Sequence, residues 1–190
     1  KRVGVRDQID FSPVFFQQQL TPSAADLTAF ISANQKDVDA EYEKEKHRYT
    51  GLEKQVRARH ILIKVDEKAS DDTKAEAKKR ADALLARAKK GEDFASLAKQ
   101  NSEDTGSAKK GGDLGWNPKG RMVKPFDDAQ FALTPGQISD LVQSTFGFHV
   151  IKVEGVREGD VAVDVAKREL AEKLYLDRRA QDLAKAAADH

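Results

Sequence analysis

Hydrophobic and polar residues alternate along residues 56–65, VRARHILIKV, with the period of two that is typical of a β-strand. Apolar runs at residues 138–142 and 148–153 predict two closing strands. The two faces of the first strand are expected to carry Val56, Ala58, His60 and Leu62 on one side and Arg57, Arg59, Ile61 and Ile63 on the other.

Between these strands the apolar spacing changes to the helical period. Residues 70–90 predict a long helix that ends at Gly91, because glycine readily adopts the left-handed backbone of helix C-termini. Shorter helices are predicted around Phe94 and over residues 126–133, with a glycine-rich loop at residues 106–120. The buried stripe of the long helix is predicted as Ala75, Ala81, Leu84, Leu85 and Ala88.

The segments on either side of this region are mainly helical by pattern. A short strand is expected at residues 3–9, then a helix that Thr21 caps and Pro22 opens at its first position, then a charged helix over residues 37–47. A further helix is predicted over residues 161–188. Because short isolated helices are marginal in water, we expect these arms to pack on each other, on the central region or on a partner.

The apolar face of the arms leaves three roles open: intramolecular packing, a cradle for client polypeptides, or a dimer interface. The strongest candidates for an interaction surface are aromatic and aliphatic residues close to the N-terminus, since a contiguous exposed apolar patch usually marks an interaction site. These residues are Phe11, Val14, Phe15 and Phe16.

Composition narrows the class of protein. The 190 residues include 39% hydrophobic and 34% charged residues, with 33 basic and 32 acidic side chains, so the net charge of +1 gives no case for a nucleic-acid binder. The absence of cysteine excludes disulfides and thiolate metal sites. No apolar run is long enough to span a membrane, and the first residue is not Met, so we expect a processed protein or a piece of a longer one.

The best candidates for functional side chains are two histidines in the strand patterns, His60 and His149, and Asp104 before the glycine-rich loop. Each has an ordinary alternative: a histidine on an apolar strand is usually a core residue, and an aspartate can cap a turn. The ordered series of motifs around these three residues favours a functional role. These motifs are RARHILIK, FASLAKQNSED, GGDLGW, GRMVKPFDDAQFAL and GQISDLVQSTFGFHVIKV.

In this order the motifs resemble the parvulin family of peptidyl-prolyl cis/trans isomerases over residues 56–154. The resemblance implies an α+β fold: a small, mostly antiparallel sheet with surrounding helices, in which the strands of His60 and His149 are central neighbours. It implies three domains or arms, at residues 1–54, 55–156 and 157–190. The arms are expected to form a second, mostly α module.

The same resemblance implies a site for proline-containing polypeptides. His60, His149 and Asp104 would form a hydrogen-bond network, accompanied by the polar pair Ser144 and Thr145. The side chains that would grip the proline ring or line its pocket are Leu114, Met122, Phe126, Phe131, Phe146 and Trp116. Met122 and Phe126, four residues apart on a helical pattern, are by spacing alone equally good core residues.

No bond is broken when an X-Pro peptide isomerises, so the chemistry calls for no cofactor and no metal. The segment at residues 64–68, KVDEK, is of mixed sign, whereas binding of a phosphoserine would need clustered basic side chains. We therefore expect isomerisation that does not depend on phosphorylation.

The arms resemble, more weakly, bacterial envelope foldases of the SurA, PpiD and PrsA kind, in which the terminal segments join into a chaperone module. This implies unfolded polypeptides as partners and a periplasmic or cell-envelope location. Two alternatives remain beside the isomerase: a peptide-holding chaperone of weak catalytic activity, and a scaffold or dimerisation piece of a membrane-anchored parent chain.

Overall fold

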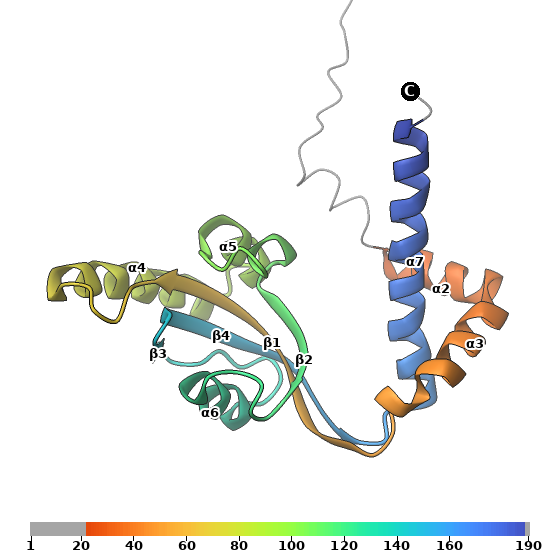
Figure 1. Ribbon diagram of the computed structural model, residues 1–190, viewed down its shortest axis with the longest axis horizontal. Coiled ribbons are helices and arrows are strands. Elements are labelled where there is room, and N and C mark those ends of the chain that lie inside the picture. Colours follow the sequence, from red (N-terminus) through yellow and green to blue (C-terminus); the bar gives the residue numbers. More distant parts are fainter. Residues whose placement is uncertain (1–21, 189–190) are drawn as a thin grey trace, which may run out of the picture. The chain divides into compact units, whose positions relative to one another are not determined.

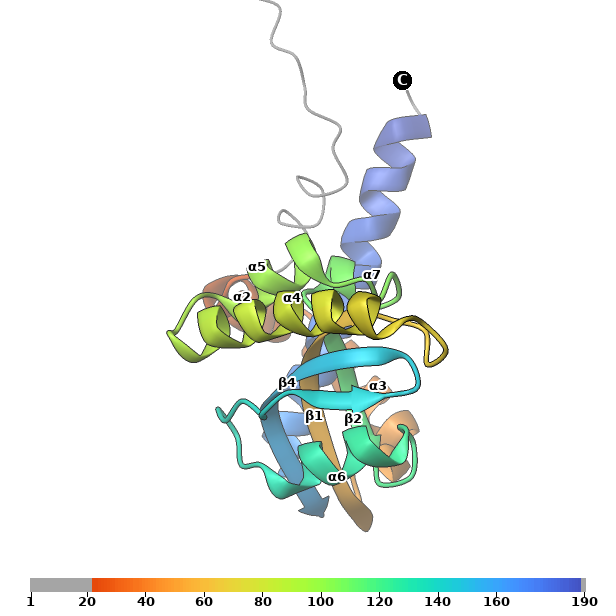
Figure 2. The same ribbon diagram turned by 90° about the vertical axis from the view of Figure 1, so that its left-hand side faces the viewer.

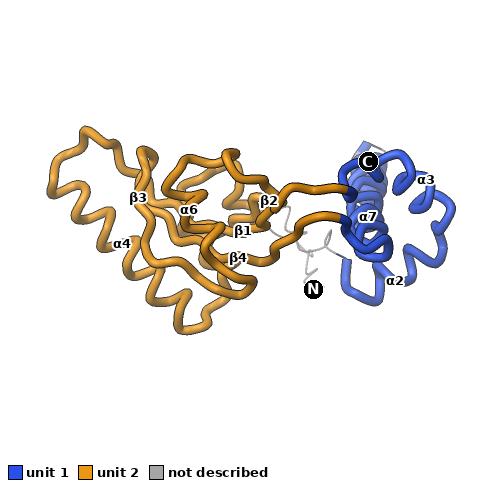
Figure 3. The backbone as a smooth tube through the Cα atoms, turned by 90° about the horizontal axis from the view of Figure 1, so that it is seen from below, with its two compact units in different colours: residues 1–50, 160–190 blue, residues 51–159 orange. Residues whose placement is uncertain are grey.

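The structure is a computed structural model that describes residues 22–188. It divides the chain into two compact units, residues 51–159 and residues 1–50 with 160–190, coloured separately in Figure 3. The strand expected at residues 3–9 and the apolar residues Phe11, Val14, Phe15 and Phe16 lie outside the described residues.

The unit of residues 51–159, unit 2 in Figure 3, contains an antiparallel four-stranded sheet in the order β2-β1-β4-β3 (Figure 1). Its strands are β1 (Leu52–Lys64), β2 (Asp113–Pro118), β3 (Val142–Ser144) and β4 (Gly147–Gly159). In the central β1–β4 pair, Leu62 is directly opposite His149. Opposite residues share a face, as do residues two apart on one strand, so His60 and His149 project from the same side of the sheet.

Helices cover both faces of this sheet, as Figure 2 shows. Helices α4 (Asp71–Lys89) and α5 (Phe94–Asn101) pack on the face of Ile61 and Ile63. Helix α6 (Lys124–Ala132) packs on the opposite face, against Val56 and Ala58. The predicted division of the β1 residues between two faces and the predicted α+β class are thereby confirmed.

The buried stripe of α4 differs from the prediction at one position. Ala75 is exposed, and Ala77 is buried in its place. From Ala77 the buried positions recur at intervals of four, three and four residues, which keeps them in phase with 3.6 residues per turn, whereas Ala75 is out of phase. The helix begins where the Ser70 side chain accepts a hydrogen bond from Thr73 N–H.

The secondary structure of two segments was predicted wrongly. The glycine-rich loop at residues 106–120 contains a short 3₁₀ turn, η2 (Ala108–Lys110), and the edge strand β2. Conversely, most of residues 138–142 is not strand, and β3 begins only at Val142. There the Ser139 hydroxyl, not a ladder carbonyl, accepts the hydrogen bond from Ile151 N–H, so side-chain pairing interrupts the regular ladder.

The other unit is helical among its described residues. It contains α2 (Ala24–Ala33), α3 (Gln35–Glu45), the short 3₁₀ turn η1 (Lys46–Arg48) and α7 (Val163–Ala188). Two small cores join α7 to the other helices, one around Tyr42 and Leu170 and one around Leu27 and Val38. No helix within residues 22–188 has the length and apolarity needed to cross a bilayer.

The start of α2 corrects a prediction. Pro22 was expected at the first helical position, but the helix begins at Ala24. The reason is a reciprocal capping box: Ser23 Oγ accepts from Asp26 N–H, and the Asp26 carboxylate accepts from Ser23 N–H. The N-cap is therefore Ser23, two residues after the predicted cap Thr21.

Candidate active site

His60 and His149 lie side by side at the centre of the sheet. Their imidazole rings are stacked with centroids 5.5 Å apart and planes 17° from parallel, and their Nδ1 atoms are 3.3 Å apart. Both residues are buried, with 6% and 4% of their surface exposed. The register of β1 and β4, which the resemblance implied to be central neighbours, therefore brings the two rings together.

Asp104 reaches His60 from the segment that follows α5. Ser102 Oγ accepts a hydrogen bond from Leu62 N–H, and Glu103 N–H donates to Leu62 O, which ties this segment to β1. As a result, Asp104 Oδ2 lies 2.8 Å from His60 Nε2. The other carboxylate oxygen accepts from Gly106 N–H.

Ser107 is a site residue that the sequence reasoning missed. It is buried, its hydroxyl donates to Asp104 Oδ2, and its oxygen lies 3.1 Å from His60 Nε2. Its only signal in the sequence is a serine three residues after Asp104 in NSEDTGS, a spacing that also suits an ordinary turn. The fold makes the difference, because it buries the turn against β1.

Ser144 completes the polar row at the far side of His149. Its Oγ lies 2.7 Å from His149 Nε2 and accepts a hydrogen bond from Phe146 N–H in the β3–β4 turn. Thr145, the other member of the predicted polar pair, is exposed in the same turn. The structure therefore brings Ser144, but not Thr145, into the row with the histidines.

The ionisation of this row follows from burial. Desolvation lowers the pKa of His60, against the opposing effect of Asp104. Desolvation and the neighbouring His60 lower the pKa of His149 to about 4. For Asp104, desolvation raises the pKa, but hydrogen bonds from Ser107, His60 and Gly106 N–H outweigh it and lower the pKa to about 2. At pH 7 both histidines are neutral and Asp104 is a carboxylate.

These charges set the direction of each hydrogen bond. A carboxylate can only accept, so His60 Nε2 carries the proton and donates to Asp104, and the unprotonated His60 Nδ1 accepts from His149 Nδ1–H. His149 Nε2 then accepts from the Ser144 hydroxyl. The result is one polarised chain of donors that runs from Ser144 to Asp104.

An apolar cluster borders this row. The Phe126 ring meets His60 and His149 edge to face, with centroids 5.6 Å and 5.3 Å away. Helix α6 holds Phe126 there, and Phe126 is 3% exposed. Three of the predicted proline-pocket residues are partly buried and pack against the same cluster, namely Leu114, Met122 and Phe131.

Two further predicted residues lie elsewhere. Phe146 is 57% exposed at the β3–β4 turn, directly after the Ser144–Thr145 pair. The Trp116 ring packs over Gly155 of β4, where an added Cβ would come within 2.8 Å of it, and the Arg157 guanidinium lies 4.4 Å from its centroid. The core cluster around Phe126 does not include Trp116.

The GGDLGW motif brings β2 close to His60. Gly112 has φ of +76°, its carbonyl accepts from His60 N–H at 2.9 Å, and an added Cβ would lie 2.2 Å from His60 O. Only glycine tolerates both this backbone conformation and this approach. Gly112 therefore fixes the backbone that carries the His60 ring.

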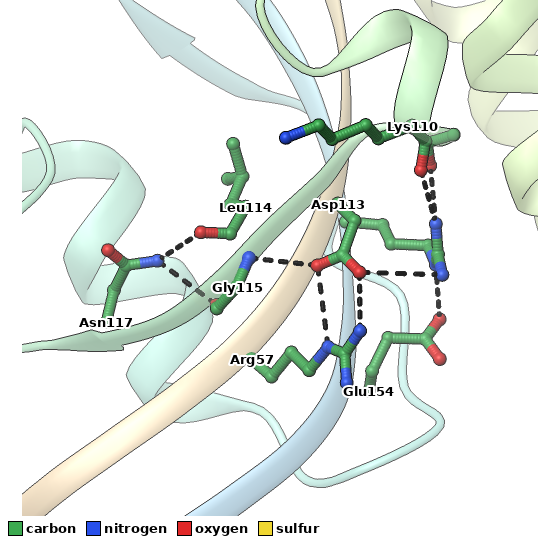
Figure 4. A network of polar contacts seen from close by, with 9 residues as sticks. Arg57, Lys110, Asp113, Leu114, Gly115, Asn117 and Glu154 are labelled. Carbon is green, nitrogen blue, oxygen red and sulfur yellow. Dashed lines mark hydrogen bonds and ion pairs between the residues drawn. The ribbon is translucent and has the colours of Figure 1, made fainter. Parts of the chain in front are cut away.

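Asp113 holds β2 against β1 through the arginines of β1 (Figure 4). Its carboxylate accepts from the Arg57 guanidinium at 2.6 Å and from Gly115 N–H at 2.9 Å, and Arg59 lies 3.7 Å from it. Arg59 also pairs with Glu154 of β4. Burial raises the pKa of Asp113, but these partners outweigh it and hold the pKa below its usual value. This network joins β2, β1 and β4 next to Leu114.

Within residues 22–188 no cluster of three or more His, Cys, Asp or Glu side chains is arranged to hold a metal ion. The arrangement offers a dry, uncharged imidazole pair, one flanking carboxylate, and an apolar wall. Such surroundings suit binding and polarisation of a neutral group. They do not favour nucleophilic attack by Ser144, because its hydrogen-bond acceptor His149 has a lowered pKa and is a weak base.

Comparison with known proteins agrees with this geometry. Residues 41–157 match the model of the PPIC-type PPIase domain family. The chain is 46% identical over 110 residues to the foldase protein PrsA of Geobacillus sp. strain WCH70, covering 58% of this chain and 36% of that protein. It is 44% identical over 121 residues to the chaperone SurA of Alkalilimnicola ehrlichii, covering 64% of this chain and 28% of that protein.

Among solved structures, PrsA from Bacillus subtilis is 32% identical, with a TM-score of 0.52, and the match covers 90% of this chain and 56% of that one. The chain spans about a third of the length of the curated relatives it matches, 36% and 28% for these two. The predicted parvulin resemblance is confirmed by the family match: this chain belongs to the PPIC-type peptidyl-prolyl cis/trans isomerase domain family.

Proposed function

We propose that the chain catalyses cis/trans isomerisation of X-Pro bonds in polypeptides. The observation that carries the proposal is the continuous row Ser144–His149–His60–Asp104 bordered by Phe126. Amide resonance imposes a barrier of ~18–20 kcal/mol, and no bond needs to break. A site lowers that barrier by binding the twisted amide better than the planar one, which takes an apolar grip on the ring and fixed polar groups.

The roles follow from position. In this proposal Leu114, Met122 and Phe126 hold the proline ring and Phe131 lies at the edge of the pocket, whereas Phe146 is exposed in the β3–β4 turn. In this proposal His149, Ser144 and Thr145 bind the X-Pro amide, while His60 and Asp104 keep His149 in one orientation. Trp116 has no role in this assignment, because its ring packs over Gly155.

The substrate class in this proposal needs no phosphate. A cavity of about 170 Å³ beside Ser144 and Thr145 is lined by Asp66 and Glu67, with Lys74 as its one basic residue. A phosphoserine side chain would meet two carboxylates there and no cluster of arginines. We therefore expect unmodified X-Pro segments to be the substrates.

The terminal arms, residues 1–54 and 157–190, serve in this proposal as a chaperone module for unfolded chains outside the cytoplasm, in the periplasm or cell envelope. Support comes from the names of the relatives, a foldase and a chaperone. A homodimer and a membrane-anchored parent chain are both compatible with it.

The deciding experiment is NMR exchange spectroscopy on a short unphosphorylated Ala-Pro peptide. The native chain should accelerate exchange, and Met122→Ala and His149→Ala should each abolish most of the acceleration. Val123→Ala, an exposed neighbour, and His47→Ala, an exposed histidine on η1, are the matched controls. A folded native chain without acceleration would refute the isomerase.

A second candidate function is a peptide-holding chaperone of weak activity. The specific observation in its favour is Phe146, a large apolar side chain that is 57% exposed in the β3–β4 turn, directly after Ser144 and Thr145. In an aggregation assay with an unfolded client, this role predicts that Phe146→Ser weakens protection while His149→Ala does not. Loss of protection in neither variant would exclude a holding role for the pocket.

A further inference from the structure

Helix α6 buries two polar side chains that the pocket assignment does not use. Asp127 is 4% exposed and Gln130 is fully buried. Asp127 Oδ2 accepts from Gly120 N–H at 2.5 Å, and Asp127 Oδ1 accepts from Gln130 Nε2 at 2.7 Å. Both carboxylate oxygens are therefore occupied by N–H donors.

Burial of Asp127 and Gln130 on this helix face lowers the stability of the folded state. No basic side chain within residues 22–188 forms an ion pair with Asp127, so its charge is balanced only by two N–H groups and the start of α6. Gln130 Oε1 is buried with no hydrogen-bond partner. Buried carboxylates and orphaned acceptors both oppose folding, and apolar residues would pack here at lower cost.

What the pair holds is the loop between β2 and α6. Gly120, at φ of +86°, turns its N–H toward Asp127, and Val123 O at the other end of the loop accepts from Phe126 N–H and Asp127 N–H. Met122 lies between these two anchors, and its side chain packs against the cluster that contains Phe126. The loop thus carries one wall of the proposed proline pocket.

We infer that Asp127, supported by Gln130, is the positioning residue of the proline pocket: it fixes the Gly120 end of the loop and thereby the place of Met122. The inference rests on the proposed isomerase function for its catalytic consequence. Asp127 touches no substrate, and acts only through Met122.

The hydrogen bonds give the substitutions distinct expectations. In Asp127→Asn, the new amide oxygen can accept from Gly120 N–H while its NH₂ donates to Gln130 Oε1 after the Gln130 amide turns over, so both contacts of residue 127 are kept and the unpartnered atom of Gln130 becomes Nε2 in place of Oε1. In Asp127→Ala, Gly120 N–H and Gln130 Nε2 both lose their acceptor. Asp128→Ala is the matched control, because Asp128 is exposed and bonds only Lys124 at the surface.

Met122 is the only methionine of the chain, so ¹³C-methyl-methionine labelling of the full chain gives one resonance that reports on the loop. We expect this resonance to move in Asp127→Ala and to stay in place in Asp127→Asn and Asp128→Ala. For the Ala-Pro peptide we expect kcat/KM to fall on the order of tenfold or more in Asp127→Ala alone, through a higher KM.

Two results would overturn the inference: a folded Asp127→Ala variant with the native methyl resonance, or an Asp127→Asn variant as impaired as Asp127→Ala. If Asp127→Ala does not fold, Gln130→Leu carries the same test, with a displaced resonance expected and an unmoved one contradicting the inference. The methyl resonance needs no turnover, so an inactive native chain would refute the isomerase proposal while the positioning of Met122 is still decided.

Discussion

His60 and His149 meet through like atoms, Nδ1 to Nδ1 at 3.3 Å, although 89 positions separate them in the chain. Two such nitrogens can be hydrogen-bonded only if one carries a proton and the other does not. The Asp104 carboxylate on the far side of His60 decides which, because it requires the His60 proton at Nε2. One carboxylate therefore sets the tautomers of both rings.

The first prediction concerns those tautomers. At pH 7, ¹⁵N chemical shifts of the imidazoles should identify His60 as the Nε2–H form and His149 as the Nδ1–H form. Observation of His149 in the Nε2–H form would contradict the donor chain from Ser144 to Asp104.

The second prediction is a loss of stability in mild acid. His149 has a pKa of about 4 when folded and about 6.5 when unfolded, so below pH 6.5 the unfolded chain binds more protons. Stability contributed by the neutral ring is complete above pH 6.5 and declines as the pH falls toward 4, by on the order of 3 kcal/mol. The lowered pKa of His60 acts in the same direction.

Urea unfolding at pH 7.5, 6.0 and 4.5 measures this decline. A further decline is expected as the pH falls from 3.8 toward about 2, because the stability that the lowered pKa of Asp104 contributes is lost over this range. Equal stability at pH 7.5 and 4.5 would be incompatible with buried neutral histidines.

The third prediction tests Ser107. Its hydroxyl donates to Asp104 Oδ2, and this bond is the largest of those that lower the pKa of Asp104. Ser107→Ala should therefore raise the Asp104 pKa above its present value of about 2, as followed by the ¹³Cγ shift of Asp104. Thr105→Ala, in the exposed part of the same turn, should not. An unchanged Asp104 titration in Ser107→Ala would show that the hydroxyl does not stabilise the carboxylate.

The fourth prediction separates backbone strain from collision in the glycine-rich segment. Gly112→Ala places a Cβ 2.2 Å from His60 O at a positive φ, so it should lower the free energy of unfolding by several kcal/mol, more than strain alone. Gly115→Ala, at φ of +68° with nothing within 4 Å of the new Cβ, should cost only about 1–2 kcal/mol. Comparable losses from chemical denaturation of the two variants would rule out the close contact at His60.

Local patterns account for much of the fold. The alternation in β1 predicted which residues share a face, because side chains of a strand alternate between its two sides, and the structure places α6 on one face and α4 and α5 on the other. Errors occurred where side chains replace backbone partners, as at Ser23 in place of Thr21 and at Ser139 beside β3. Such hydrogen bonds leave no periodic trace in a sequence.

By itself the sequence determined the fold class and the family, because these depend on ordered motifs and apolar periodicity, and by resemblance it named candidate site residues. The tertiary structure alone decided which polar side chains meet: it added Ser107, left Thr145 in solvent, placed Trp116 over Gly155 and buried Asp127 beside Gln130. The physical reason is that a hydrogen bond depends on a few tenths of an ångström between groups remote in the chain, and only the packed fold sets that distance.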